Sequence, residues 1–358
     1  MIIGEKDKKI MDLQKNIYAN DRTVLMDAVP LEMPLCISIE PSNICNFKCR
    51  MCFHGNNETA DEAKPLQNMP SEIFEKTLSD IKDWVRKSGK RIKLMKLYSL
   101  GEPLLHPDVC EWVRKIKNAE ICDSLEITTN ASLLTESVAE KLVDYGLDTL
   151  RVSVYGVSED EQKRVTQSAV SAESIRDKVI YLQEYKKKTD HKNPVVYAKM
   201  LDTHTDENQK FMDSYADVAD HVGIDEPFEL TSGDNDIFDN LFGENEAGEA
   251  HSQSLNSNFF KKRRPCRYPF THLTVRSDGK VVVCCADWLK ETCYGNVRDH
   301  SLDELWNSRS LYDFRCRMLN YRGADISCCR GCEIPYRDTP EDDLSDFPVE
   351  KLSYTNNY

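Results

Sequence analysis

The sequence predicts an α/β protein in which a partial (β/α)6, TIM-like barrel is followed by a small C-terminal domain rich in cysteine. Short apolar runs alternate with longer amphipathic segments from about residue 35 to residue 225, and this alternation is typical of repeated βα units around a parallel sheet. Eight of the 14 cysteines then fall between Cys266 and Cys332. This second concentration indicates a separate unit with its own chemistry.

Six short apolar runs account for the predicted sheet. They are residues 35–40, 92–99, 124–129, 149–155, 194–201 and 221–225. The segments between them show helical periodicity, at residues 71–88, 107–118, 135–145, 172–188 and 206–219. Ser71, after Pro70, is the expected N-cap of the first helix, and Gly146 is the expected end of the third. Six βα units make three quarters of a (β/α)8 barrel, so we expect the chemistry at the carboxyl ends of the strands.

Composition divides the chain further. We expect an N-terminal extension (1–34), the barrel (35–225), an acidic linker or lid (226–262), the cysteine-rich domain (263–335) and a C-terminal tail (336–358). Between residues 223 and 260 there are nine Asp or Glu and no Lys or Arg. This stretch is either a solvated connection or an active-site lid anchored by Phe228, Phe238 and Phe242.

Charge and hydropathy exclude several classes of protein. With 40% hydrophobic and 30% charged residues the chain is globular, and its formal net charge is −14. Broad nucleic-acid binding relies on Lys and Arg that neutralise phosphates, so we expect no nucleic-acid partner. Apolar stretches such as residues 281–286 are far shorter than the ~20 residues of a membrane helix. The N-terminus becomes charged at Glu5 and Lys6, before a signal-peptide core could develop, so we expect a cytoplasmic protein without a membrane partner.

Three cysteines, Cys45, Cys49 and Cys52, follow the first predicted strand directly. Thiolates at this CxxxCxxC spacing on a loop can converge on one metal centre. Two alternatives compete, because the spacing also suits one face of a buried helix, and a structural zinc site could form if His54 supplied a fourth ligand. Three soft ligands fit a four-iron cluster that keeps one iron open to a small molecule.

CxxxCxxC after the first strand of a partial barrel resembles the signature of the radical S-adenosylmethionine (SAM) superfamily. In that superfamily the three cysteines hold a four-iron, four-sulfur (4Fe–4S) cluster, and SAM chelates the fourth iron. The resemblance therefore implies that Cys45, Cys49 and Cys52 are metal ligands and that SAM is a cofactor. It also implies that the bound SAM is reductively cleaved to a 5′-deoxyadenosyl radical.

Further motifs stand in the order of that superfamily. Leu100-Gly101-Glu102-Pro103 is similar to its GGEP motif, with Leu100 in place of the first glycine, and Thr129-Asn130-Ala131 is similar to TNG, with Ala131 in place of glycine. Ser153 ends the fourth strand where a polar side chain often meets the ribose, and Met51 matches a position that packs on adenine. The residues that the resemblance implies for SAM binding are Met51, Gly101, Glu102, Pro103, Asn130 and Ser153.

The second concentration of cysteines contains Cys266, a hairpin expected over 272–285 with its turn at Ser277-Asp278-Gly279, Cys284, and the pair Cys329 and Cys332. A helix is expected over 301–318. This stretch resembles the SPASM or twitch domains of radical SAM enzymes, which implies one auxiliary 4Fe–4S cluster held by Cys266, Cys284, Cys329 and Cys332. The alternatives are Cys285 for Cys284, Cys328 for Cys329, part of a further cluster at Cys293 and Cys316, and a four-cysteine zinc site.

The resemblance implies an oxidoreductase or epimerase that removes a hydrogen atom from its substrate. Only 44 residues precede Cys45, too few for the leader-binding domain of many peptide-modifying relatives, so we expect a small polar substrate such as a sugar, aminocyclitol or nucleotide sugar. We also expect an electron donor such as flavodoxin or ferredoxin. The candidate catalytic residues are His54, Tyr98, Arg151, Tyr155 and Cys293. A peptide maturase and a non-catalytic iron–sulfur or zinc module are the alternatives.

Overall fold

The computed structural model describes residues 22–55, 65–228, 237–242, 263–337, 339–352 and 354. Within these residues nine strands form one sheet, in the order β6-β5-β4-β3-β2-β1-β7-β8-β9. The strands are β1 (Cys36–Ile39), β2 (Ile92–Lys96), β3 (Cys122–Thr129), β4 (Thr149–Ser153), β5 (Val195–Leu201), β6 (His221–Asp225), β7 (His272–Val275), β8 (Lys280–Val282) and β9 (Cys293–Asn296). Strands β1 to β7 pair in parallel, whereas β8 and β9 are antiparallel.

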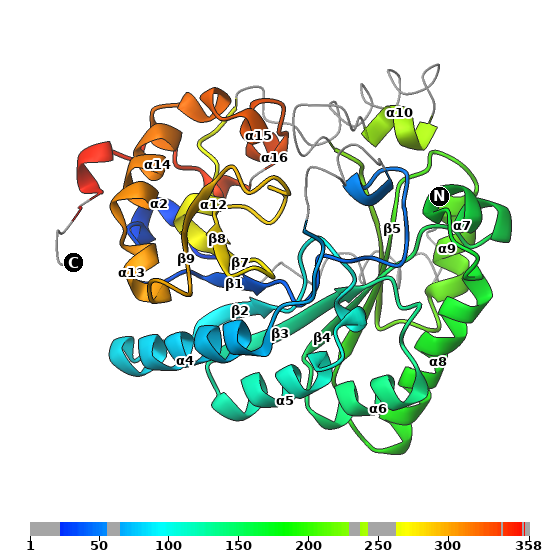
Figure 1. Ribbon diagram of the computed structural model, residues 1–358. Helices are drawn as coiled ribbons and strands as arrows, with labels where there is room; N and C mark the ends of the chain where they lie inside the picture. The colour runs from blue at the N-terminus through cyan, green and yellow to red at the C-terminus, as the bar shows by residue number, and fades with distance from the viewer. Residues whose placement is uncertain are drawn as a thin grey trace.

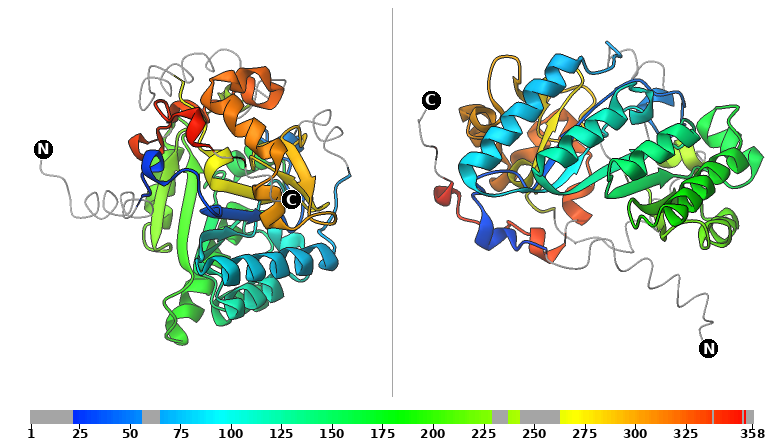
Figure 2. Two further views of the ribbon diagram at one scale, coloured as in Figure 1. Left: turned by 90° about the vertical axis from the view of Figure 1, so that its left-hand side faces the viewer. Right: turned by 90° about the horizontal axis from the view of Figure 1, so that it is seen from below.

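The predicted α/β class is confirmed, and the barrel is open because β1 pairs with β7 rather than with β6. The helices of this part are α4 (Ser71–Ser88), α5 (Val109–Ala119), α6 (Glu136–Asp144), α7 (Glu159–Thr166), α8 (Ala172–Lys188) and α9 (Glu207–Tyr215). Figures 1 and 2 show α4, α5, α6 and α8 along one face of the sheet. Apolar side chains of these helices fill the core, as where the rings of Phe74 and Trp112 stack with centroids 4.0 Å apart. The other face of the strands is left for the site.

The cysteine-rich part extends the sheet of the barrel, since β7 lies beside β1. The expected hairpin is present as β7 and β8, and Gly279 has the positive φ of 86° that its turn requires. Strand β9 was not expected. The helix expected over 301–318 is two helices, α13 (Leu302–Trp306) and α14 (Arg309–Leu319), because Ser308 accepts a hydrogen bond from the Leu311 amide and starts a new helix.

Two further expectations at helix starts need correction. Ser71 is not the N-cap of α4: Pro70 holds that position, without a side-chain hydrogen bond, and Ser71 is the first helical residue. Helix α7 was not expected, although Ser158 caps it by accepting a hydrogen bond from the Glu161 amide. The Ser-x-x-Glu pattern at its start was the signal that could have predicted it.

Short helices complete the fold. They are α2 (Leu25–Ala28), η1 (Phe53–Gly55), η2 (Pro103–Leu105), α10 (Ile237–Phe242), α12 (Tyr268–Thr271), η3 (Arg322–Asp325), α15 (Ser327–Arg330), α16 (Ile334–Arg337), η4 (Pro340–Asp342) and η5 (Val349–Lys351). Leu25 of α2 packs in a second apolar core with Leu344, Phe347 and Phe270. Arg22 donates to Asp342 at 2.6 Å beside this core. The two ends of the described chain therefore pack against the cysteine-rich part.

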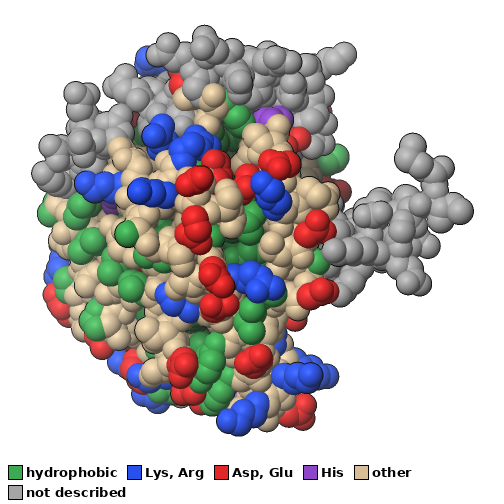
Figure 3. Space-filling model, turned by 90° about the vertical axis from the view of Figure 1, so that its right-hand side faces the viewer, with side chains coloured by type: hydrophobic (Ala, Val, Ile, Leu, Met, Phe, Trp, Pro, Cys, Tyr) green, Lys and Arg blue, Asp and Glu red, His purple; other side chains and the backbone are tan. Residues whose placement is uncertain are grey.

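Most of the expected acidic linker or lid, residues 229–236 and 243–262, lies outside the described residues, as does the side chain of Phe238. On the face of the molecule drawn in Figure 3, acidic and basic side chains are interspersed. No helix in the described part is long and apolar enough to cross a membrane.

Candidate active site

The first thiol group, Cys45, Cys49 and Cys52, lies on the loop that follows β1. This loop is not helical from Cys45 to Cys52, so the buried-helix alternative is wrong. The three thiols are neighbours: burial first, then the charges of Cys52 and Cys45, raise the pKa of Cys49 well above its ordinary value. Burial likewise raises the pKa of Cys45 to about 12. A cationic metal centre would offset this cost of ionisation, and such a donor set therefore fits an iron–sulfur cluster.

His54 is the fourth ligand that the zinc alternative requires. Among the described residues, no three Cys, His, Asp or Glu side chains already form a group that could hold a metal ion, whether zinc or a cluster. The ring of His54 packs on Phe53, with centroids 4.0 Å apart. Burial lowers the pKa of His54, and its Nε2 atom has no hydrogen-bond partner in the structure.

Residues far along the chain fix the shape of this loop. The Glu102 amide donates to the Ile44 carbonyl at 2.9 Å. A Cβ added at Gly101 would lie only 2.4 Å from the carbonyl oxygens of Ile44 and Ser42, so only glycine allows this close approach. Asn130 donates through Nδ2 to Asn46 at 3.0 Å. The motif residues at the ends of β2 and β3 therefore hold the loop that carries the thiols.

Glu102 itself points inward rather than toward a cavity. Its carboxylate accepts hydrogen bonds from Thr129 Oγ1 at 2.6 Å, from the Asn130 amide at 2.8 Å and from the Leu104 amide at 3.0 Å. Burial raises its pKa to about 7, although these three bonds oppose the shift. The side chain thus joins the ends of β2 and β3, and Pro103 starts η2 directly after it.

Two cavities flank the first thiol group. The barrel cavity has a volume of about 590 Å³. Its lining includes Met51 and Cys52 of the thiol loop, residues of strands β1 to β6, and residues of the cysteine-rich part such as Cys285 and Trp288. The side cavity, of about 250 Å³, is lined by Met51, Val154, Tyr155 and Arg164, among others. Met51 lines both, so the two cavities adjoin at this side chain.

The structure brings some of the expected catalytic residues together. Tyr98 and Arg151 line the barrel cavity, and Tyr98 donates to Glu126 at 2.6 Å. Tyr155 lines the side cavity, and its hydroxyl is hydrogen-bonded to the Cys49 thiol.

Ser153 is the last residue of β4 and pairs in register with Lys199 of β5. Cys293 is exposed on β9 with its thiol directed at the Gly295 carbonyl, and His54 and Cys293 line neither cavity.

The second thiol group surrounds a separate small cavity and consists of Cys266, Cys284, Cys328, Cys329 and Cys332. Cys284 lines this cavity and Cys285 lines the barrel cavity, although their two thiols are hydrogen-bonded to each other. Cys316 lines none of these three cavities. The sulfur atoms of Cys328 and Cys329 lie 3.8 Å apart, and both residues line this small cavity. Their positions therefore do not distinguish one from the other as a ligand.

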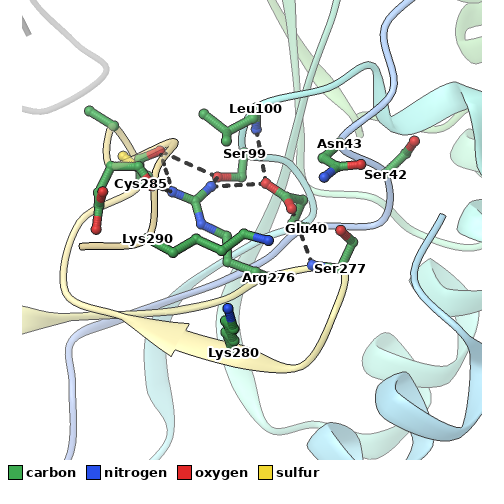
Figure 4. Close-up of polar contacts among 12 residues, drawn as sticks. Glu40, Ser42, Asn43, Ser99, Leu100, Arg276, Ser277, Lys280, Cys285 and Lys290 are labelled. Carbon is green, nitrogen blue, oxygen red and sulfur yellow. Dashed lines mark hydrogen bonds and ion pairs between the residues drawn. The ribbon is translucent and has the colours of Figure 1, made fainter. Parts of the chain in front are cut away.

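A buried ion pair joins the end of β1 to the loop of Cys284 and Cys285, and it was not predicted from the sequence. Arg276 and Glu40 have no exposed side-chain surface and lie 2.9 Å apart. Figure 4 shows the Arg276 guanidinium between the Glu40 carboxylate and the Cys285 carbonyl, to which it donates at 3.1 Å. Glu40 also accepts from the Leu100 amide at 3.3 Å. Glu40 stands directly after the apolar strand β1, and this position was the signal in the sequence that could have predicted a buried carboxylate.

Known proteins share both parts of this arrangement. The profile of the Radical SAM superfamily matches residues 39–212, and that of SPASM, an iron–sulfur cluster-binding domain, matches residues 266–333. The tungsten-containing aldehyde ferredoxin oxidoreductase cofactor-modifying protein of Pyrococcus furiosus is 24% identical over 322 residues, which cover 81% of this chain and 86% of that protein. A probable GTP 3',8-cyclase of Methanocaldococcus jannaschii is 36% identical over 130 residues, which cover 36% of this chain and only 39% of the relative.

Solved structures show the same fold. Streptococcus suis SuiB bound to S-adenosylmethionine matches with a TM-score of 0.58 and 18% identity, covering 88% of this chain and 79% of SuiB. BtrN in complex with AdoMet and 2-DOIA matches with a TM-score of 0.52 and 15% identity, covering 84% of this chain and 93% of BtrN. With both family profiles matched in order, the chain belongs to the radical SAM superfamily and carries a SPASM domain, so its cofactors are a 4Fe–4S cluster, SAM and auxiliary iron–sulfur centres.

Proposed function

We propose that this radical SAM enzyme removes a hydrogen atom from a small polar substrate in the barrel cavity, with dehydrogenation or epimerisation as the outcome. The observation that carries the proposal is that the first thiol loop, the strand ends and the loop of Cys285 line one cavity together. When bound, the cluster and SAM supply a 5′-deoxyadenosyl radical that can take hydrogen from an unactivated C–H bond. A cavity between two parts of the chain suits this chemistry because it limits access of water.

The residues of the loop and side cavity have distinct roles in this proposal. Cys45, Cys49 and Cys52 hold the first cluster. Met51, Tyr155 and Arg164 bind SAM in the side cavity, which adjoins the thiols. Gly101, Glu102, Pro103 and Asn130 act by holding the loop and the strand ends in place, and Ser153 lies at the strand end nearby.

In the SPASM domain we propose Cys266, Cys284, Cys329 and Cys332 as the ligands of one auxiliary 4Fe–4S cluster. The placement of Cys284 with Cys266 and Cys332 supports the choice of Cys284 over Cys285. Both Cys328 and Cys329 lie beside this cavity, so the choice of Cys329 rests on the CxxC spacing.

The position of Cys285 favours epimerisation as a specific outcome. Cys285 is a lining residue of the barrel cavity, and for epimerisation its thiol would return a hydrogen atom to the face of the substrate carbon opposite to the abstraction. The sulfur radical left behind then takes up one electron and one proton, the electron coming from a donor such as flavodoxin or ferredoxin. For dehydrogenation, an auxiliary cluster held by Cys266, Cys284, Cys329 and Cys332 would supply a one-electron acceptor, and the substrate radical would become a ketone by loss of one proton and one electron.

The size of the barrel cavity, about 590 Å³, favours a small molecule over a peptide. Peptides are bound by structural neighbours such as SuiB with precursor peptide SuiA. The small-molecule proposal therefore remains the better supported.

Anaerobic reconstitution of the whole protein tests the proposed function. We expect about eight irons per chain and formation of 5′-deoxyadenosine after reduction in the presence of SAM. The triple variant Cys45→Ala/Cys49→Ala/Cys52→Ala should lose about four irons and all SAM cleavage while it keeps the second cluster. If the reduced protein with both clusters intact cleaves no SAM, with or without candidate polyols, it is a binding module and the proposal is wrong.

A further inference from the structure

The barrel cavity is rich in cations, although the chain carries a net charge of −14. Its lining includes five basic side chains and one acidic side chain, Asp225. The five are Lys96, Arg151, Lys199, Arg267 and Arg337. They come from β2, β4, β5, the segment before α12, and α16. Both the barrel and the SPASM domain therefore contribute positive charge to the same space.

Four of these cations have an acidic partner. Arg151 lies 3.7 Å from Glu126, and Lys199 lies 3.0 Å from Asp225. The other two pairs are Arg267 with Asp342 at 3.2 Å and Arg337 with Glu226 at 3.5 Å. Lys96 differs, because it makes no ion pair within 4.0 Å among the residues that the structure describes. Within the described part of the chain, Lys96 is therefore a cation of this lining without an acidic partner at ion-pair distance.

Among the described residues no carboxylate lies within ion-pair distance of Lys96. Burial lowers the pKa of Lys96, but the charges of Tyr98, Cys36 and Glu126 raise it well above its ordinary value. Glu126 faces Lys96 in the register of β2 and β3, but its carboxylate is bonded by Tyr98 and lies near Arg151. The ammonium group lies 5.5 Å from the centroid of the Tyr98 ring, which stabilises a cation only modestly. A charge taken out of water without a paired counter-ion costs free energy. A bound anion would remove that cost.

A neighbouring hydroxyl adds an independent observation. Thr128 lines the same cavity from β3, and its Oγ1 atom is buried without a hydrogen-bond partner in the structure. Buried hydroxyls are nearly always hydrogen-bonded, so this atom is suited to a ligand. Resting on the proposed function, we propose that the substrate carries an oxyanion, a carboxylate or a phosphate, which pairs with Lys96 and accepts a hydrogen bond from Thr128.

SAM also carries a carboxylate, so two sources of this chemistry must be distinguished. SAM is proposed to lie in the side cavity, where Arg164 supplies a cation that is paired with Glu161 at 2.6 Å. With its sulfonium and ammonium groups SAM brings a net positive charge, so it does not neutralise the barrel cavity. The substrate is therefore the better source of the anion.

Binding of inorganic phosphate to the reduced, SAM-loaded holoenzyme tests the proposal. The readout is the broadening of the phosphorus NMR signal by the paramagnetic cluster, titrated at constant ionic strength, with acetate as a competitor that represents carboxylates. We expect saturable broadening in the wild type and a dissociation constant at least about tenfold higher in Lys96→Met, since hydrogen bonds to charged groups are strong. Lys96→Arg should restore most of the affinity. The matched control is Lys93→Met, at an exposed position on the same strand, which should differ from wild type by less than twofold.

Three outcomes would overturn the proposal. One is that wild type does not bind phosphate, and another is that Lys96→Met binds it as well as wild type does. The third is that Lys96→Met weakens SAM binding tenfold and phosphate binding less than twofold, which would assign Lys96 to the carboxylate of SAM. Phosphate binding can be measured whether or not the protein cleaves SAM, so failure of the proposed function is separately visible. Equal iron content in all variants shows that each has folded.

Discussion

Replacing Arg276 by methionine should destabilise the protein more than any surface substitution of the same kind. The guanidinium lies 2.9 Å from Glu40 and also donates to the carbonyls of Cys284, Cys285 and Asp287 at 3.3, 3.1 and 2.6 Å. Neither charged side chain is exposed. Arg276→Met therefore leaves the Glu40 carboxylate buried without its counter-ion and leaves three carbonyls without this donor. Removal of one partner from a buried pair costs about 3–5 kcal/mol.

Urea unfolding of the anaerobic holoenzyme, followed by tryptophan fluorescence, measures this loss. With a slope of about 3 kcal/mol per molar urea, a loss of about 4 kcal/mol lowers the midpoint by about 1.3 M. The double variant Glu40→Gln/Arg276→Met should be much more stable than the sum of the two single effects predicts, because it leaves no unpaired buried charge. Arg298→Met, at an exposed pair with Glu72 3.6 Å apart, should change stability by less than about 1 kcal/mol. Additive single effects, or a loss at Arg276 as small as that at Arg298, would refute the reasoning.

Three other predictions concern the site. Gly101→Ala should cost about four irons in a metal assay, because the added methyl group would displace the backbone before Cys45; retention of all iron would contradict the close approach at 2.4 Å. Cys284→Ala should likewise lose the auxiliary cluster and its electron paramagnetic resonance signal, whereas Cys285→Ala should keep it; the reverse result would exchange their roles. For Glu102, a folded-state pKa of about 7 against an ordinary 4.5 means that the folded protein holds its proton more tightly, so stability falls as pH rises through this range. Relative to Glu102→Gln, wild type should therefore lose about 2 kcal/mol between pH 5.5 and pH 7.5 in urea unfolding, and parallel pH profiles of the two proteins would contradict the shift.

Local patterns were sufficient to predict most of the fold. The bounds of α4 and α8, and of strand β6, agree with the expected ranges, because apolar periodicity and turn residues act over a few neighbouring residues. The same kind of pattern failed for residues 301–318, where Ser308 can either continue a helix or cap a new one. The hydrogen bond that Ser308 makes in the folded chain decides between the two.

The sequence by itself determined that three thiols share one loop after the first strand, that a second thiol group follows a hairpin, and that the chain belongs to an α/β class. Only the tertiary structure decided which residue of a doublet lines which cavity, as for Cys284 and Cys285. It also decided that Arg276 pairs with Glu40, 236 residues earlier. The physical reason is that spacing along the chain sets local geometry, whereas contacts between distant segments depend on strand register and on the packing of the whole sheet. That Lys96 has no acid within ion-pair distance among the described residues is likewise visible only in the packed structure.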